Sequence, residues 1–305
     1  MGGGWCCKSP KKNRVSPHGL IYKNFPHFVN KDGTYLFCRY WEPITTPRAM
    51  MMILHGGGEH SGCFKNITPI FTNLSMFVFS HDYIGHGHSE GARLSVPEFG
   101  NYIRDCIQHI DLMRERYPTL PLYILSNSMG ALIAINVLIQ KPENIAGMIF
   151  IAPLVQMNPE SATPFKMFCA KVMYHLMPNF VLGHLDPQWL SSSPEEVQKM
   201  VDDPLHSLGP YRMRFTVQVL EAVAKVKAFL PLIEIPLLIA HGEFDKLCDI
   251  NGSILLYTSV SSKDKTMKIF KDAFAQLHNE APSITRELQV LIRKWLIQRL
   301  PPMAE

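Results

Sequence analysis

The sequence predicts an α/β protein with a mostly parallel, doubly wound sheet and a helical insertion. Residues 49–54 and 76–80 are short, continuous apolar runs, which are typical of strands buried on both faces. Such runs alternate with helical patterns along the chain, and this alternation favours a parallel sheet covered by helices. The alternation stops between residues 158 and 225, where no clear strand is found. We therefore expect one core that carries an inserted helical cap.

The expected elements follow in chain order. A strand is predicted over residues 34–41, before the two apolar runs named above. Further buried strands are expected at LYILS, GMIFIAP and IPLLIAHG, with a weaker one at TMKIF. Apolar residues recur at helical spacing over residues 99–113, 129–140 and 283–299. The core is thus expected to span residues 18–157 and 226–300, with residues 1–17 as a flexible tail and 158–225 as the cap.

The composition excludes several classes of protein. The chain has 305 residues, of which 47% are hydrophobic, and its net charge is +4. This is ample material for a core. No basic stripe is interleaved with aromatic residues, so we expect no nucleic-acid partner. No apolar run approaches the roughly 18 residues of a membrane span. The 7 cysteines show no C-x-x-C pair, which favours free thiols in a reducing compartment.

The stretch YILSNSMGALIA, residues 123–134, suggests a serine nucleophile. An apolar run ends at Leu125, and Ser128 follows in S-N-S-M-G before another apolar run. A nucleophile elbow holds its serine at such a strand-to-helix turn, with small neighbours that let strand and helix approach closely. Ser126 stands where the first small residue is usually glycine. The alternative is an ordinary serine at the end of a strand.

The run His55-Gly56-Gly57-Gly58 follows the predicted strand 49–54. A glycine-rich turn allows backbone N–H groups to point at one spot. Together with a downstream elbow, this turn is interpreted as an oxyanion hole in which the N–H groups of Gly57 and Met129 stabilise a tetrahedral intermediate. The alternative is a plain turn.

Asp245 lies in AHGEFDKLCD, directly after the strand IPLLIA. Open α/β sheets place functional groups at the carboxyl ends of their strands. We expect Asp245 to orient a histidine and to stabilise its imidazolium form, with Asp249 as a nearby competitor. From the residues alone, His278 is the candidate base, because it follows Asp245 at an ordinary triad distance along the chain.

The segment HDYIGHGHSEG, residues 81–91, raises the question of a metal site. Its candidate ligands are His81, Asp82, His86 and His88. Their spacing matches no strong metal signature, and glycines interrupt it. We expect no metal here, and a loop whose side chains support the floor of the active site.

Six ordered motifs resemble the monoacylglycerol lipases, which have the α/β-hydrolase fold. The motifs are LFCRYWEP, HGGGEHSG, HDYIGHGHSEG, MNPESATPFK, FDKLCD and LHNE, and the likeness runs from about His18 to about Leu300. The resemblance implies hydrolysis of glycerol esters of one fatty acid through a serine acyl-enzyme, without a cofactor. It also implies a lipid-facing cap, and it places Glu59 and His278 at the glycerol end of the site.

The chain departs from this family at several positions. Its elbow reads S-N-S-M-G-A where the family has G-H-S-M-G-G. Cys63 replaces an arginine near the glycerol end, and Met200 replaces a cap tyrosine. In the segment KDAFAQLHNE, Ala275 replaces the first histidine of the pattern aromatic-His-x-x-His-x-Glu, which is the family's catalytic base. The resemblance therefore implies a triad that is incomplete at Ala275.

Three functions stay open. The first is an active monoacylglycerol lipase, impaired by the change at Ala275, with His278 or a water-assisted route as the base. Use of His278 as the base needs a remodelled loop, because His278 lies three residues after Ala275. Three residues of helix rise about 4.5 Å, whereas catalytic groups need placement within about 0.5 Å. The second is a non-catalytic homologue that binds acylglycerol or a protein partner. The third is another ester hydrolase, such as a lysophospholipase.

The first residues predict attachment to a membrane. Gly2 follows Met1, as N-myristoylation requires, and Cys6 and Cys7 suit palmitoylation. One myristoyl chain binds weakly, so a second acyl chain or a basic cluster is needed, and such a cluster is present at Lys8, Lys11, Lys12 and Arg14. We expect a cytoplasmic protein in peripheral contact with membrane. The alternative is an unmodified, disordered tail.

The cap offers a second route to lipid. It carries a wide apolar face formed by Phe165, Phe168, Val172 and Leu176, with methionines between them. One interpretation is that this face packs on the core. The other is a flexible, methionine-rich lid that admits a lipid chain and touches the membrane.

Overall fold

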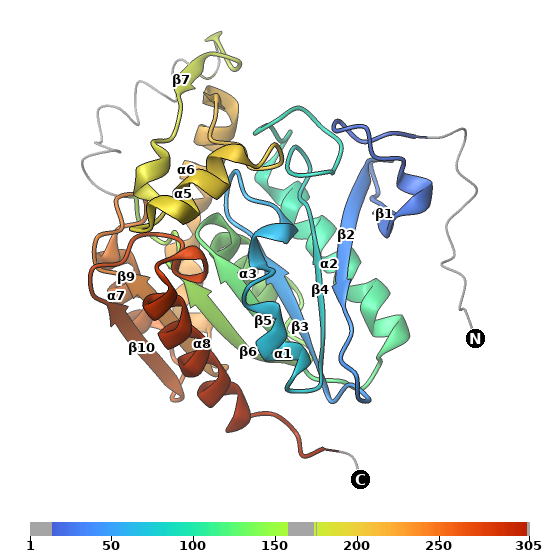
Figure 1. The fold of residues 1–305 in the computed structure, drawn as a ribbon, viewed down its shortest axis with the longest axis vertical. Coiled ribbons are helices and arrows are strands. Elements are labelled where there is room, and N and C mark those ends of the chain that lie inside the picture. The colour runs from blue at the N-terminus through green and yellow to red at the C-terminus, as the bar shows by residue number, and fades with distance from the viewer. Residues whose placement is uncertain (1–13, 158–173, 175, 304–305) are drawn as a thin grey trace.

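The computed structural model describes residues 14–157, 174 and 176–303. Its core is an eight-stranded sheet in the order β1-β2-β4-β3-β5-β6-β9-β10 (Figure 1). Strand β2 runs antiparallel to β1 and β4, and the remaining pairs are parallel. The strands are β1 (His27–Val29), β2 (Tyr35–Trp41), β3 (Ala49–Leu54), β4 (Met76–His81), β5 (Leu122–Asn127), β6 (Ile145–Ile151), β9 (Leu237–Gly242) and β10 (Lys265–Phe270).

Helices cover both faces of this sheet. The elements concerned are α1 (Thr68–Thr72), α2 (Phe99–Arg116), α3 (Met129–Gln140), α6 (Met213–Val226), α7 (Ile250–Ser259) and α8 (Pro282–Ile297). Apolar side chains of α2, α3 and α6 join the hydrophobic cluster on one face, and those of α1 and α8 join the cluster on the other. The predicted α/β-hydrolase fold is confirmed.

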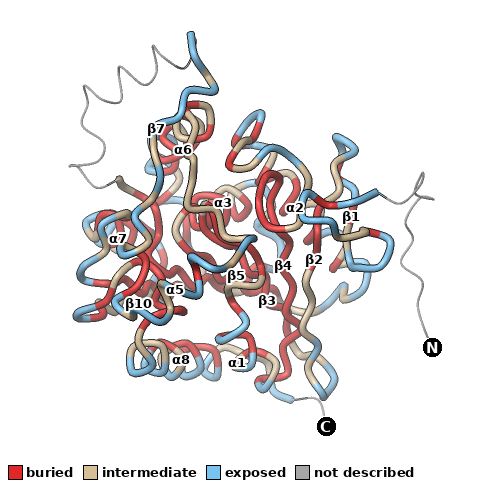
Figure 2. Tube along the Cα trace, turned by 45° about the horizontal axis from the view of Figure 1, so that its top comes forward, coloured by how far each residue is buried: buried red, intermediate tan, exposed pale blue. Residues whose placement is uncertain are grey.

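The central strands explain why the sequence shows continuous apolar runs. Every residue of β3, β4, β5 and β9 is buried, as the red core in Figure 2 shows. Along β3, Met50 and Met52 belong to the cluster on one face, while Met51 and Ile53 belong to the cluster on the other. Because successive side chains of a strand point to opposite faces, a strand covered on both sides needs apolar residues at every position.

Between β6 and β9 the chain leaves the main sheet. The described part of this segment contains a 3-10 helix η3 (Pro187–Trp189), helix α5 (Pro194–Asp202), helix α6 and two strands, β7 (Val181–Gly183) and β8 (Tyr211–Arg212). The sequence shows no clear strand here, and the structure adds two short ones, because β7 and β8 pair with each other. Both are too short to show a period in the sequence, and neither joins the main sheet.

Several predicted lipid contacts lie at or beyond the edge of the described residues. Gly2, Cys6 and Cys7 are outside them, as are Phe165, Phe168 and Val172. Leu176, the last residue of the predicted apolar face, is 76% exposed. No helix within the described ranges combines the length and the apolar character that crossing a bilayer requires.

The N-terminal segment contacts the core earlier than the sequence suggests. Arg14 forms an ion pair with Glu90 at 2.5 Å, and Val15 forms a β-bridge with Ile21. Both residues fall within residues 1–17, which the sequence predicts to be a tail. The boundary at residue 17 stays a prediction.

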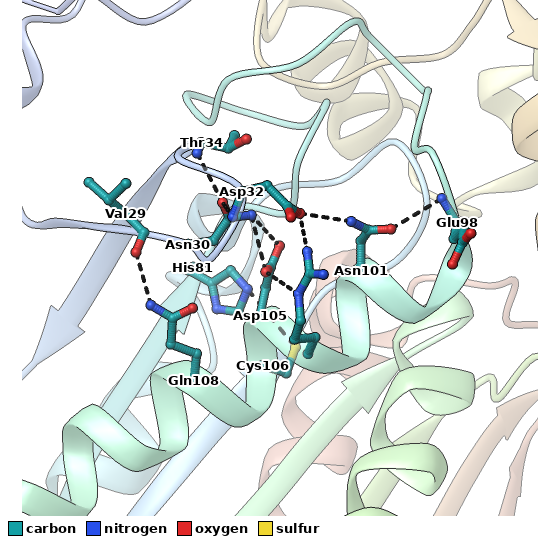
Figure 3. A network of polar contacts seen from close by, with 11 residues as sticks. Val29, Asn30, Asp32, Thr34, His81, Glu98, Asn101, Asp105, Cys106 and Gln108 are labelled. Atoms are coloured by element: carbon teal, nitrogen blue, oxygen red, sulfur yellow. Dashed lines mark hydrogen bonds and ion pairs between the residues drawn. The ribbon is translucent and has the colours of Figure 1, made fainter.

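A polar network fastens the β1–β2 turn to helix α2 (Figure 3). The Asn30 amide donates to both carboxylate oxygens of Asp105 at 3.1 Å, and Asn30 Oδ1 accepts from the N–H groups of Asp32 and Thr34. Asp32 in turn accepts from Asn101 at 3.0 Å. Burial raises the pKa of Asp105 to about 6, against the lowering effect of the Asn30 hydrogen bond. The network holds the β1–β2 turn against helix α2 and does not involve Ser128.

Candidate active site

Ser128 lies between strand β5 and helix α3, in a strained backbone conformation. Its φ is 49° and its ψ is −117°, a region that non-glycine residues rarely adopt. The Ser128 N–H donates to the carbonyl of Ile151 at 3.1 Å, which holds the turn against β6. A Cβ at Gly130 would lie 2.3 Å from the carbonyl oxygen of Leu54, so only glycine fits there. This is the strand-turn-helix geometry of a nucleophile elbow.

Ser126 occupies the first small position of the elbow without disturbing the strand. It pairs with Leu54 on β3 and with Phe150 on β6. Its hydroxyl is buried and has no hydrogen-bond partner within the described part of the chain. The backbone therefore accepts serine, at the energetic cost of an unsatisfied buried hydroxyl.

Ser128 lines a cavity of about 350 Å³ between the core and the cap. Its walls are mostly apolar and come from both parts, namely Leu154, Leu182, Leu190, Phe215, Val219 and Leu220. Its polar lining includes Glu59, Asn127 and Gln276, and the Glu59 carboxylate forms hydrogen bonds with the other two side chains. The cavity is thus suited to a molecule with a long apolar part and a small polar head.

The predicted oxyanion donors line this cavity. Met129 is the first residue of α3, so its N–H has no acceptor within the helix. Gly57, on the loop after β3, lines the same cavity. His55 holds that loop: its Nδ1–H donates to the Gly56 carbonyl at 2.8 Å, and its Nε2 accepts from the Tyr83 N–H at 3.1 Å. Burial lowers the pKa of His55, which keeps this imidazole neutral.

Asp245 follows β9 and is held by its own turn. Its Oδ1 accepts from the N–H groups of Leu247 and Cys248, at 2.8 Å and 3.0 Å. Its Oδ2 has no hydrogen-bond partner within the described ranges, and His241 Nε2 lies 3.4 Å away. The competitor, Asp249, is engaged elsewhere, because it caps α7.

The hydroxyl of Ser128 contacts a thiol. Its Oγ lies 3.5 Å from Cys248 Sγ, and no imidazole or carboxylate of a described residue forms a hydrogen bond with it. Burial raises the pKa of Cys248 well above its ordinary value, so this group stays a neutral thiol. Ala275 lines the same cavity and offers only a methyl group. The elbow geometry is present, but no described residue places a base beside Ser128.

His278 lies away from the nucleophile. Its ring stacks on Phe64 with centroids 4.3 Å apart, and its Nε2 is 3.8 Å from Glu59 Oε1. Both ring nitrogens are buried without a hydrogen-bond partner among the described residues. Burial lowers its pKa to about 3, so the ring is neutral. The structure brings His278 to Glu59, as the resemblance implies for the glycerol end, and gives it no contact with Ser128.

Glu59 links the oxyanion loop to the elbow. Its Oε2 accepts from the Gly56 N–H at 2.5 Å, and its Oε1 accepts from the Asn127 amide at 2.8 Å. The carboxyl group is buried at the polar end of the cavity. Burial raises its pKa to about 7, and these two hydrogen bonds oppose the rise.

Two of the residues that differ from the family pattern, Cys63 and Met200, do not line the cavity. Cys63 lies at the seam between core and cap, with its Sγ 4.0 Å from His206 Nδ1. Beside it, His60 Nε2 contacts Asp203 Oδ2 of the cap at 2.9 Å. Met200 is buried within the cap. Neither Cys63 nor Met200 reaches the Ser128 cavity.

The segment 81–91 supports the loop after β3. Asp82 Oδ1 accepts from the N–H and the hydroxyl of Ser61, and its Oδ2 accepts from the His88 N–H. Within the described residues, no group of three or more His, Cys, Asp or Glu side chains has the arrangement of a metal site.

Glu280 is a structural residue that the sequence reasoning missed. Its buried carboxylate accepts from the N–H groups of Phe274 and Ala281 and, across the seam, from the hydroxyls of Ser191 and Ser192. Glu280 thereby connects the loop that carries Ala275 to Ser191 and Ser192 of the cap. The only sequence signal was its place as the last residue of LHNE.

Comparisons with known proteins agree with this fold. The family model described as serine aminopeptidase, S33, matches residues 45–282. The human monoglyceride lipase is 43% identical over 286 residues, which are 94% of this chain and 94% of that protein. A monoglyceride lipase homolog of monkeypox virus is 35% identical and covers 89% of this chain and 97% of its own. A soluble variant of the Saccharomyces cerevisiae monoglyceride lipase, solved with a substrate analog, superposes with a TM-score of 0.81 at 20% identity, covering 97% and 100% of the two chains.

Proposed function

The chain belongs to the monoglyceride lipase family of serine hydrolases, and from this premise we propose that it binds monoacylglycerol and hydrolyses its ester slowly. In this proposal Ser128 is the nucleophile, Asp245 the orienting acid, and Gly57 and Met129 the oxyanion donors. The acyl chain occupies the apolar part of the cavity. The single observation that carries the slow rate is the neutral Cys248 thiol, in place of a base, beside the Ser128 hydroxyl.

The polar end of the cavity supports a glycerol head. His278 lies behind Glu59 and does not itself line the cavity. Among the described residues, neither its two buried ring nitrogens nor the buried Asn127 Oδ1 has a hydrogen-bond partner. Glu59 lies between them, bonded to Asn127 and 3.8 Å from His278. Buried polar atoms without partners raise the free energy of the protein. The hydroxyls of a glycerol head, which both donate and accept, relieve that cost. Glu59 and His278 are therefore assigned to substrate binding.

The chemistry explains why hydrolysis is slow rather than absent. A serine hydroxyl is a weak nucleophile unless a base removes its proton as it attacks. A neutral thiol does not do this, and His278 has no contact with Ser128. The oxyanion donors are backbone groups, so they act whether or not a base is present. In a serine protease stripped of its triad, such groups leave about 10³–10⁴-fold catalysis over water.

The proposal is tested by separating binding from turnover. Monoacylglycerol should raise the melting temperature of the wild-type protein, since a ligand that binds only the folded state stabilises it. A fluorophosphonate probe should label Ser128 slowly, and Ser128→Ala should abolish the labelling while keeping the melting shift. No shift with any monoacylglycerol would refute binding. Fast labelling and rapid glycerol release by the wild-type protein would refute the slow turnover.

The same function includes contact with the membrane in which the substrate resides. We propose a cytoplasmic protein that associates peripherally through acylation of Gly2, Cys6 or Cys7 and through the cap. The exposed apolar residues Leu176, Met177 and Phe180 support the cap contact. Mass spectrometry of the N-terminal peptide from cells tests the acylation, and an unmodified peptide would reject it.

A further inference from the structure

The loop after β3, residues 55–60, lies directly against the cap. The Gly58 carbonyl accepts from the Ser207 N–H of the cap at 2.7 Å. A Cβ at Gly58 would lie 2.3 Å from the Ser207 carbonyl oxygen, and the φ of Gly58 is +83°. Glycine is therefore needed here for the turn and also for the close approach of the cap. At this point the loop and the cap meet backbone to backbone.

A second contact joins the same loop to the cap two residues later. The Nε2–H of His60 donates to Asp203 Oδ2 at 2.9 Å, and the His60 side chain is only 5% exposed. Asp203 follows helix α5, and its Oδ1 accepts from the Leu205 N–H at 2.9 Å. Burial raises the pKa of Asp203, but the hydrogen bonds from His60 and Leu205 lower it to about 2. The carboxylate is thus ionised and binds the loop with one oxygen and its own turn with the other.

Gly57 lies next to these contacts, in the middle of the loop. A Cβ at Gly57 would lie 3.5 Å from Phe215 Cζ, on helix α6, so this residue also faces the cap. The core holds the two ends of the loop. At one end His55 bonds to the loop and to the core, and just beyond the other end the N–H and the hydroxyl of Ser61 donate to Asp82. The cap therefore contacts the part of the loop that carries the Gly57 N–H.

We propose that Asp203 and His60 are positioning residues, which hold the loop so that the Gly57 N–H is in place only while the cap lies on the core. This rests on the proposed function, in which Gly57 is an oxyanion donor. Neither Asp203 nor His60 lines the cavity, so each acts through the backbone of the loop and not by touching the substrate. A misplacement of about 1 Å in a catalytic site can cost about 10²-fold in rate. Two contacts across the seam are therefore enough to control the rate.

A positioning role differs from a role in binding. Oxyanion donors act on the charge that develops in the transition state, and removal of one donor costs about 10²–10³ in kcat. The acyl chain is assigned to cavity walls to which Asp203 and His60 do not belong. Loss of the contact between these two residues should therefore slow the reaction of Ser128 and leave the affinity for monoacylglycerol unchanged.

Two matched pairs of variants of the full-length protein test the proposal. Asp203→Asn removes the carboxylate that accepts from His60, and Asp202→Asn is its control, because Asp202 is exposed and its carboxylate bonds within α5. His60→Leu removes the donor to Asp203, whereas His60→Gln keeps an N–H donor. Both changes at His60 remove the ring Nδ1 that accepts from the Gly62 N–H at 3.1 Å, so this pair differs in the contact with the cap.

Three quantities are measured for each variant. They are the rate at which a fluorophosphonate probe labels Ser128, the affinity for 1-monooleoylglycerol in the Ser128→Ala background, and the hydrogen exchange of the amides of residues 55–60. We expect Asp203→Asn and His60→Leu to be labelled about 10- to 10²-fold more slowly than the wild type. Both should bind the lipid with unchanged affinity and exchange the loop amides faster. Asp202→Asn and His60→Gln should resemble the wild type.

Three results would overturn the inference. The first is equal labelling of Asp203→Asn and Asp202→Asn, and the second is equal slowing by His60→Leu and His60→Gln. The third is a loss of lipid affinity that accounts for the slower labelling, because the contact would then shape the cavity and not the loop.

Hydrogen exchange separates this inference from the proposed function, since it needs no turnover. If the wild type neither binds the lipid nor reacts with the probe, the proposed function fails. Faster exchange of the loop in Asp203→Asn alone would then still show that the cap holds the loop. Unchanged exchange would refute that as well.

Discussion

The Sγ atom of Cys248 lies 3.5 Å from the Oγ atom of Ser128, and it is the hydrogen-bond partner that the described structure gives to this hydroxyl. Burial raises the pKa of the Cys248 thiol. The thiol therefore stays protonated and cannot remove the proton of the Ser128 hydroxyl. In the proposed function, the residues assigned as nucleophile, orienting acid and oxyanion donors therefore lack a base among the described residues. The turnover of bound substrate should therefore respond strongly to changes at position 275, whereas a change at His278 should act through substrate binding.

The substitution Ala275→His should raise monoacylglycerol hydrolysis by about 10³-fold or more, because loss of a triad histidine costs on the order of 10⁶ in kcat. The measurement is glycerol release under saturating substrate, with Ser128→Ala in the same background as the control. The assignment would be wrong if His278→Ala abolished a robust wild-type activity while Ala275→His added nothing. In that case His278 would be the base.

The substitution Ser126→Ala should stabilise the protein by about 1 kcal/mol, because it removes a buried hydroxyl that has no partner. The unfolding free energy from urea titration measures the effect. Ser80→Ala is the matched control: Ser80 is also fully buried on a central strand, but its hydroxyl donates to the Ile53 carbonyl at 2.8 Å. That variant should be destabilised. Equal effects of the two changes would contradict the role given to the missing partner.

The substitution Glu280→Gln should lower the unfolding free energy by about 2–4 kcal/mol, because the new amide faces N–H and hydroxyl donors with only one oxygen to accept them. Urea titration again measures the change. The control is Glu287→Gln, since Glu287 is exposed and pairs with Lys268 on the surface. It should change stability by less than about 1 kcal/mol. A Glu280→Gln protein as stable as Glu287→Gln would show that Glu280 does not join cap and core.

Stability should fall as the pH rises from about 4.5 to about 7, through Glu59. Its pKa is raised from the ordinary 4.5 to about 7 in the folded protein, so over this range the unfolded chain loses the proton that the folded protein keeps. The penalty is absent at lower pH and complete above pH 7. Glu59→Gln should abolish this pH-dependent loss of stability. The unfolding free energy of the variant, relative to that of the wild type, should therefore increase as the pH rises from about 4.5 to about 7. The comparison is made by chemical denaturation at several pH values, and a constant difference would contradict the raised pKa.

Affinity for monoacylglycerol should rise with acyl-chain length, by up to about 0.8 kcal/mol for each buried CH₂. The apolar cavity walls are the reason, and isothermal titration of Ser128→Ala with short- and long-chain esters measures it without turnover. Val219 is on the wall contributed by α6, and Val219→Asn should weaken the binding of long-chain esters more than that of short-chain esters. Equal affinity for all chain lengths would exclude the cavity as the acyl site.

The sequence by itself determined the fold and the local parts of the site. Continuous apolar runs predicted the central strands, because a strand covered on both faces is apolar at every position. The pattern around Ser128 predicted the turn, since strand, small residues and helix are all local features. The change at Ala275 was also visible, because a motif shows which residue is present at each of its positions.

Only the tertiary structure decided which of these residues meet. Ser128 and Cys248 are 120 positions apart in sequence, and their contact follows from the pairing of β5, β6 and β9. Asp245 and Asp249 both follow β9, and the start of α7 is what engages Asp249 as a cap. Glu280 acquires its two serine partners, Ser191 and Ser192, only when the cap folds back on the core. Such contacts depend on packing between distant segments, whereas the periodicity of a sequence reports only how each segment is buried.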